Sequence, residues 1–235
     1  MKDLPDGAFP DNLVEANTYQ LNSKALAEEI DEIYAEMNEE LAVLREREKM
    51  DADPQLPLTV MLRARQKVEL LKVPIFVELI RDHIQDGKSV ALFLNYKETL
   101  YAIAERIEEI PKSYIHGEQK DSERISQIDD FQRDKTHVIL CTLSAGGVGI
   151  NLHDTNGTRP RVSLISPSFS AIDLKQALGR IHRAGGKSPA LLYIIFAKDT
   201  IEAEVCKKVK RKLTNIDMIN DNDVSLVDFN SNPKK

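Results

Sequence analysis

From Gly87 onward the chain alternates short apolar runs with amphipathic segments, and this alternation constrains the fold more than any other feature. The apolar runs predict strands over 89–95, 112–116, 137–141, 162–166 and 190–196. Helical periodicity predicts helices over 97–109, 121–133, 171–183 and 200–213. Strands that alternate with helices of this length form parallel sheets through right-handed crossovers. We therefore expect an α/β fold in which a mostly parallel sheet carries helices on both faces.

The N-terminal part of the chain has a different pattern. The first 20 residues contain Pro5, Gly7 and Pro10 without any period, which predicts extended or loop structure. A helix begins after Ser23 and is broken at 51–57, and two further helices follow over 58–72 and from Pro74 to near Gly87. The first helix carries a single apolar stripe, formed by Leu26, Ile30, Ile33, Met37, Leu41 and Leu44. An α-hairpin packed on the body of the protein fits this pattern, and an acidic coiled coil that binds a partner is the alternative.

The charge is unevenly distributed along the 235 residues. Residues 1–60 hold 15 acidic and 5 basic side chains, whereas the remainder holds 23 acidic and 27 basic ones, within a total of -6. This balance argues against a generally cationic nucleic-acid coat and directs any contact with a polyanion to the body. No apolar run reaches the roughly 18 residues of a membrane span, no signal peptide opens the chain, and there are only two cysteines. We expect a reduced, intracellular protein that contacts no membrane.

A glycine-rich segment follows the strand predicted at 137–141. Gly146, Gly147 and Gly149 lie within the segment from Thr142 to Asn151. Glycines at such a position let the backbone approach a ligand and expose amide groups to anions. A glycine-rich turn without a ligand explains the same residues, so this segment alone does not decide between the two.

The segment 176–183 points to an anion more directly. Gln176, Arg180 and Arg183 are spaced i, i+4 and i+7, so a helix over 171–183 would project all three from one face. Two guanidinium groups beside an amide suit a phosphate, because the planar fork binds oxyanions bidentately. The alternative is a basic helix edge that forms ordinary salt bridges.

Other candidate motifs lack support. The triplets at 87–89 and 186–188 resemble the end of a phosphate-binding P-loop, but neither has the required first glycine or a following helix. Cys141 ends an apolar strand and is expected to be a core thiol. Five histidines show no metal-ligand spacing, so no metal site is predicted; they are His83, His116, His137, His153 and His182.

Four segments, in order, resemble the second RecA-like lobe of superfamily 2 helicases and translocases. Residues 90–96 are similar to motif IV and 140–152 to motif V, whereas 176–185 are similar to motif VI. Residues 114–131 resemble the His-Gly, Arg and Phe block that follows motif IV. The wording of motif V and the acidic helical segment before the lobe are most like the Swi/Snf-type branch. The resemblance implies a RecA-like three-layer domain preceded by a helical segment.

The resemblance also implies roles for single residues. Arg183 would be the arginine finger on the γ-phosphate of ATP, Arg180 its phosphate-binding neighbour, and Gln176 the residue that orients the phosphate. Gly149 and Asn151 would approach the nucleotide ribose. Nucleic-acid backbone contacts would come from the strand-end loops, namely from Asn95, His116, Gly117, Thr142 and Ser144.

These roles predict the C-terminal lobe of an ATP-dependent DNA helicase or translocase. We expect an N-terminal segment with an inter-lobe hairpin over 1–87, the lobe over 88–220 and a loose tail over 221–235. The partners would be nucleic acid, expected to be DNA, and a first RecA-like lobe that holds Mg²⁺. The chain is expected to begin where that lobe would end and to hydrolyse no ATP alone. A non-catalytic nucleic-acid-binding module and an RNA helicase are the alternatives.

Overall fold

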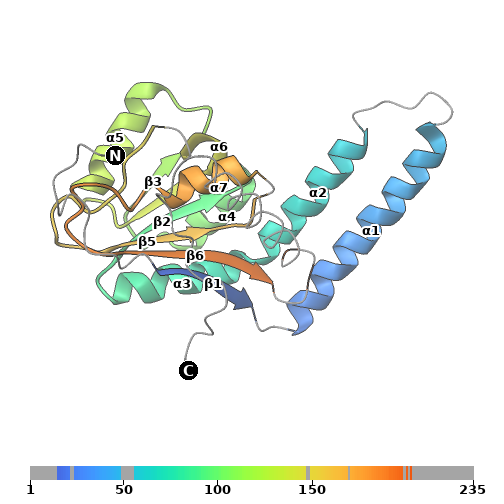
Figure 1. Cartoon of the computed structure of the whole chain (residues 1–235), viewed down its shortest axis with the longest axis horizontal. Coiled ribbons are helices and arrows are strands. Elements are labelled where there is room, and N and C mark those ends of the chain that lie inside the picture. Colours follow the sequence, from blue (N-terminus) through green and yellow to red (C-terminus); the bar gives the residue numbers. More distant parts are fainter. Residues whose placement is uncertain are drawn as a thin grey trace, which may run out of the picture.

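The apolar runs of the sequence form a six-stranded sheet in which every neighbouring pair is parallel. The computed structural model describes residues 15–21, 24–48, 56–146, 149–168, 170–197, 200 and 202. The strand order is β1-β6-β5-β2-β4-β3 (Figure 1). The strands are β1 (Glu15–Leu21), β2 (Ser89–Leu94), β3 (Lys112–Ile115), β4 (Val138–Thr142), β5 (Arg161–Ile165) and β6 (Ala190–Ala197).

The described helices follow the predicted order, but α4 and α7 are shorter than predicted and α6 is additional. They are α1 (Lys24–Glu48), α2 (Leu56–Leu71), α3 (Val73–Gln85), α4 (Lys97–Arg106), α5 (Asp121–Gln132), α6 (Leu143–Gly146) and α7 (Ala171–Leu178). Pro74 lies in the first turn of α3, and Gly87, with a φ of +75°, follows its last turn. The predicted helix over 200–213 and the predicted tail from Asp221 lie outside the described residues.

Alternate residues of the central strands enter two separate cores. Val90, Leu92 and Leu94 of β2 pack with α3 and α4, whereas Ala91 and Phe93 pack on the other face with α5, α6 and α7. All five side chains are fully buried. A strand buried on both faces reads as a continuous apolar run, which is how β2 appears in the sequence. The predicted three-layer α/β fold with a parallel sheet is confirmed.

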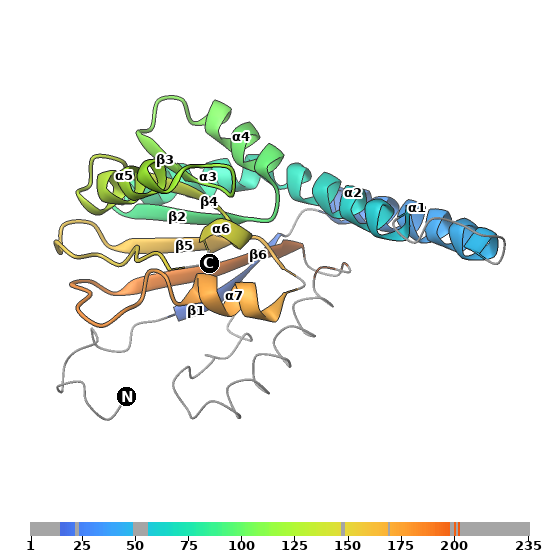
Figure 2. The same ribbon diagram turned by 90° about the horizontal axis from the view of Figure 1, so that it is seen from above.

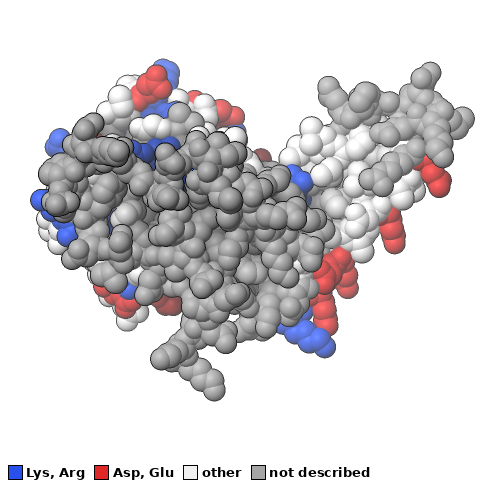
Figure 3. Space-filling model, in the orientation of Figure 1, with Lys and Arg blue, Asp and Glu red and all other residues white. Residues whose placement is uncertain are grey.

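Helices α1 and α2 form the predicted hairpin, which projects from one side of the sheet domain (Figures 1 and 2). At its base, Ile30 and Tyr34 of α1 and Val68 of α2 join the core that α3 and α4 share with the sheet. Figure 3 shows Asp and Glu side chains along the projecting hairpin, whereas most of the visible Lys and Arg side chains lie on the sheet domain. In this view acidic side chains line the hairpin, and both acidic and basic side chains lie on the sheet domain.

Strand β1 is the element that the sequence did not predict. Residues 15–21 pair in parallel with β6, so that Glu15 lies opposite Leu191 and Leu21 opposite Ala197. The segment was expected to be extended or loop, without a place in the sheet. Since β1 precedes the hairpin in the chain, both ends of the hairpin connect to the sheet domain.

None of the helices within the described ranges is both long and apolar enough to span a bilayer.

Candidate functional site

The predicted nucleic-acid contacts follow three parallel strands and so lie at the same edge of the sheet. Asn95 follows β2, His116 and Gly117 follow β3, and Thr142 ends β4. His116 is held by α4, because its Nε2 lies 3.3 Å from the Tyr101 hydroxyl and the two rings meet edge to face. The structure thus brings these loops together at the carboxyl-end edge, where ligands bind in parallel α/β sheets.

The contacts predicted after β4 differ in exposure. Thr142 is only 4% exposed, and its Oγ1 has no hydrogen-bond partner among the described residues. Ser144 lies on the short helix α6 and is exposed. Arg124 of α5 donates from Nη2 to the Ala145 carbonyl (2.8 Å), which ties α6 to α5. Ser144 is therefore accessible to a ligand in this conformation, whereas the Thr142 hydroxyl is not at the surface.

Asn95 uses its side chain within the protein. Its Nδ2 donates to Glu69 Oε2 (2.6 Å) and to the Pro167 carbonyl (2.9 Å), so that both amide hydrogens have acceptors. The backbone nitrogens of Asn95 and Tyr96 donate to the same Glu69 carboxylate. Burial and the nearby Glu69 carboxylate raise the pKa of Tyr96 to about 12. Asn95 thus belongs to a half-buried polar cluster around Glu69, which the sequence analysis did not predict.

The prediction that Gln176, Arg180 and Arg183 share one helix face is wrong. Helix α7 ends at Leu178 and Gly179 is its C-cap, so only Gln176 lies on the helix. The Arg180 nitrogen donates to the Ala177 carbonyl (3.1 Å), which closes a turn that contains Gly179. Glycine is a poor helix former, and this one lies at the point where tertiary contacts redirect the chain.

Arg180 and Arg183 lie instead beside the loop that follows β4. Arg180 donates from Nη1 to the Ile150 carbonyl (3.2 Å), and its own carbonyl accepts from the Leu152 nitrogen (2.9 Å). The Arg180 side chain is buried, at 7% exposure, whereas Arg183 is half-buried and donates from Nε to the Gly179 carbonyl (3.1 Å). The two predicted anion-binding segments are therefore adjacent.

Positive charge gathers at this junction. Burial, followed by the neighbouring Arg183, lowers the pKa of Arg180 below its ordinary value. The pKa of His153 is also lowered, first by burial and then by Arg183. Because a positive group destabilises neighbouring cations, a bound anion would relieve the repulsion.

The predicted ribose contacts lie on the same loop. Gly149 has a φ of +69°, a conformation that favours glycine, and an added Cβ would meet no atom within 4 Å. Asn151 is exposed, and its carbonyl accepts from Gln132 Nε2 (2.7 Å). The structure thus brings Gly149, Asn151, Arg180 and Arg183 together at the loop that follows β4.

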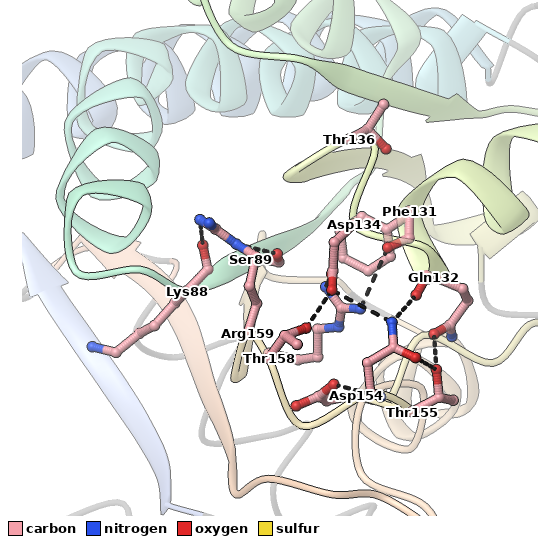
Figure 4. A network of polar contacts seen from close by, with 12 residues as sticks. Lys88, Ser89, Phe131, Gln132, Asp134, Thr136, Asp154, Thr155, Thr158 and Arg159 are labelled. Carbon is pink, nitrogen blue, oxygen red and sulfur yellow. Dashed lines mark hydrogen bonds and ion pairs between the residues drawn. The ribbon is translucent and has the colours of Figure 1, made fainter.

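A second polar network lies at the opposite, amino-end edge of the sheet (Figure 4). Arg161, which is 1% exposed, forms an ion pair with Asp134 (2.9 Å) and places its guanidinium 4.5 Å from the centre of the Phe131 ring. Asp134 also accepts from Thr158, and Asp154 accepts from two backbone nitrogens of the loop after it. These contacts fix the loop before β5, to which the sequence assigned no function.

Neither a metal centre nor a reactive cysteine emerges from the described ranges. No three His, Cys, Asp or Glu side chains among the described residues lie where they could share a metal ion. Cys141 is completely buried, and burial raises the pKa of its thiol. This fits the prediction of a core thiol.

In a comparison with known protein families, residues 71–185 match the helicase conserved C-terminal domain. Protein L364 of Acanthamoeba polyphaga mimivirus, named as a proposed ATP-dependent RNA helicase, is 38% identical over 92% of this chain and 39% of its own length. Chromatin remodeling factor mit1 of Schizosaccharomyces pombe is 28% identical over 78% of this chain and 13% of its own length. The chain therefore spans well under half of these relatives.

A solved structure shares the fold. The C-terminal part of the Fun30 ATPase domain superposes with a TM-score of 0.51 at 22% identity, over 66% of this chain and 46% of that one. At this identity the likeness concerns the fold alone.

Proposed function

Residues 71–185 form a helicase conserved C-terminal domain, the second RecA-like lobe of a superfamily 2 helicase, and on that premise we propose that the chain acts in an ATP-dependent DNA helicase or translocase. The likeness to mit1 and to ATP-dependent helicase fft3 of Schizosaccharomyces pombe supports a place in the Swi/Snf-type branch. In the proposal, ATP lies between this lobe and a first lobe, which supplies the P-loop and holds Mg²⁺.

The junction of Arg180, Arg183 and the loop after β4 carries the proposal. Arg183 is the more exposed of the two arginines, and its one hydrogen bond within the described part of the chain uses Nε. Its Nη groups can therefore meet a phosphate that a partner lobe presents, as an arginine finger does. Arg180 holds the loop through Ile150 and adds positive charge behind the finger.

The remaining nucleotide contacts follow from the same junction. In the proposal, Gln176 orients the phosphate from α7, and Gly149 and Asn151 lie against the ribose. The open space at Gly149 and the exposure of Asn151 support these roles. ATP supplies the phosphoanhydride whose hydrolysis drives movement, and this chain supplies charge that stabilises its transition state.

Nucleic acid would bind at the carboxyl-end edge of the sheet. His116, Gly117 and Ser144 offer accessible contacts there, and Asn95 and Thr142 would act through the backbone of their loops. DNA is the proposed substrate because several relatives have DNA-linked names, among them DNA repair protein rad8 of Schizosaccharomyces pombe and a RAD54-like DNA repair and recombination protein of Drosophila virilis.

RNA is the second candidate substrate, since the name of the mimivirus relative refers to an RNA helicase. A binding module without catalysis is a further alternative. ATP hydrolysis by a two-lobe protein, measured with duplex DNA, single-stranded DNA and RNA as stimulators, distinguishes the three.

Replacing Arg183 and measuring ATP turnover tests the proposal directly. We expect this chain alone to hydrolyse no ATP above background and the two-lobe protein to show DNA-stimulated turnover. Arg183→Ala should then lower turnover by about 10³-fold or more without changing the thermal midpoint. Lys187→Ala, which removes an exposed cation four residues away, is the matched control. Near-normal turnover of Arg183→Ala would overturn the assignment of the finger.

A further inference from the structure

Two charged side chains are buried where α2 ends and α3 begins, and the sequence analysis assigned a role to neither. Glu69 is 2% exposed and Lys72 is 0% exposed. Burying a charge costs free energy unless partners replace its water. The hydrogen-bond partners of Glu69 and Lys72 therefore show which parts of the structure these charges hold together.

Glu69 binds the loop that follows β2. Its carboxylate accepts from the Asn95 nitrogen (2.9 Å), the Asn95 amide (2.6 Å) and the Tyr96 nitrogen (3.1 Å). Tyr96 is the N-cap of α4, and no side-chain cap within α4 serves this helix start. A carboxylate from α2 thus accepts from the backbone nitrogens of the N-cap residue and of the residue before it, and it lies near the positive end of the α4 dipole.

Packing alone does not hold this loop. A pocket of about 330 Å³ opens beside it, lined by residues of α1, α2 and the loops after β2 and β5. The Asn95 amide also donates to the Pro167 carbonyl, which joins the loops after β2 and β5. Since one side of the loop faces a pocket, its position depends strongly on the hydrogen bonds to Glu69.

Lys72, three residues after Glu69, contacts the chain at the end of a second strand, β6. Its Nζ lies 2.5 Å from Glu202 Oε1 and 3.5 Å from the Ile195 carbonyl. Glu202 Oε2 in turn accepts from the Ala197 nitrogen at the end of β6 (3.0 Å). The base of the hairpin therefore fixes the chain after β2 and after β6, both at the carboxyl-end edge.

We propose that Glu69 is a positioning residue that holds the loop after β2 in the conformation that contacts nucleic acid, and that it thereby links the α1–α2 hairpin to that loop. The inference rests on the proposed function, because it takes the carboxyl-end edge as the nucleic-acid surface. A tilt of the hairpin would move Glu69 and, through its hydrogen bonds, the loop.

The test compares Glu69→Gln with Glu78→Gln in the full chain. Glu78 is an exposed residue of α3, so the same chemical change there leaves the loop untouched. The probes are a fluorescein-labelled 20-base-pair DNA duplex and a labelled 20-nucleotide single strand, and binding is followed by anisotropy. Hydrogen exchange at the Asn95 and Tyr96 amides reports on the loop, and exchange within β2 reports on the core.

We expect Glu69→Gln to weaken binding about tenfold and to accelerate exchange at Asn95 and Tyr96 while β2 stays protected. Glu78→Gln should match the wild type in both measurements. Faster loop exchange with unchanged affinity would overturn the positioning role, because Glu69 would then only stabilise the fold. Absence of binding by the wild-type chain would instead count against the proposed nucleic-acid surface.

The wild type also provides a test that needs no variant to fold. Its Asn95 and Tyr96 amides should exchange much more slowly than the exposed amides of Gly117 and Glu118. Equally fast exchange at both places would show that Glu69 does not hold the loop and would refute the proposal.

Discussion

Replacing Lys72 by methionine is expected to destabilise the protein far more than the loss of one surface charge would. The lysine is fully buried, and its Nζ lies 2.5 Å from Glu202 Oε1. Methionine fills the space of the aliphatic stem but removes the cation. Among the described residues, the Glu202 carboxylate, in a side chain that is 6% exposed, then keeps one hydrogen bond, from the Ala197 nitrogen. A buried charge without its partner costs about 3–5 kcal/mol, and we expect the free energy of unfolding to fall by that amount.

Urea unfolding followed by far-UV circular dichroism measures this change. With a slope of about 2–3 kcal/mol per M for a chain of this size, the midpoint should move down by about 1–2.5 M. The double variant Lys72→Met/Glu202→Gln removes both charges, and its midpoint should return most of the way to the wild-type value.

Lys67→Met is the matched control. Lys67 lies 4.0 Å from Glu36, and both side chains are more than 60% exposed. Its loss should change the free energy of unfolding by less than about 1 kcal/mol. A Lys72→Met midpoint within about 0.3 M of the control, or a double variant as unstable as Lys72→Met, would refute the argument from buried charge.

Three further predictions concern other parts of the molecule. In a Cys206→Ser background, Cys141 should react with iodoacetamide only in urea, because burial raises its pKa and closes access; rapid labelling of the native protein would contradict this. Burial lowers the pKa values of four histidines below the ordinary 6.5, so the unfolded state binds more protons than the folded state does. The free energy of unfolding should therefore fall as the pH drops from 7 to 5. A thermal midpoint that does not change over this pH range would contradict the prediction. These histidines are His83, His137, His153 and His182. Gly149→Ala should lower the free energy of unfolding by about 1–2 kcal/mol in urea, because Gly149 has a positive φ. Gly117→Ala should leave it almost unchanged, because Gly117 has no positive φ and open space surrounds it. Equal losses for the two variants would argue against backbone strain at Gly149.

The sequence predicted the sheet well where strands are buried on both faces. The run at 90–94 is apolar throughout, and the structure places it in β2, in the interior of the sheet. β1 escaped prediction because it is a polar edge strand, and its pairing partner lies at the far end of the sequence. Periodicity describes one segment at a time and contains no information about such a partner.

The candidate site shows the same limit. The sequence picked out Gln176, Arg180 and Arg183 but placed them on one helix, since periodicity continues past the glycine that ends α7. The contact between Arg180 and Ile150 is tertiary and could not be read from spacing. Glu69 was missed although a signal exists, namely a carboxylate between apolar neighbours on the buried face of an amphipathic helix.

Strand β1 also has a consequence for the order in which the protein can be made. Glu15 pairs opposite Leu191, so the first strand must wait for 176 further residues before it meets its partner. At a synthesis rate of about 5–20 residues per second, that wait is on the order of 10–35 s. During this time β1 has an unsatisfied backbone, while β2, β3 and β4 can already pair. The sheet is therefore completed last at its β1 edge, and in a ribosome-bound chain this strand would stay unpaired until β6 emerges.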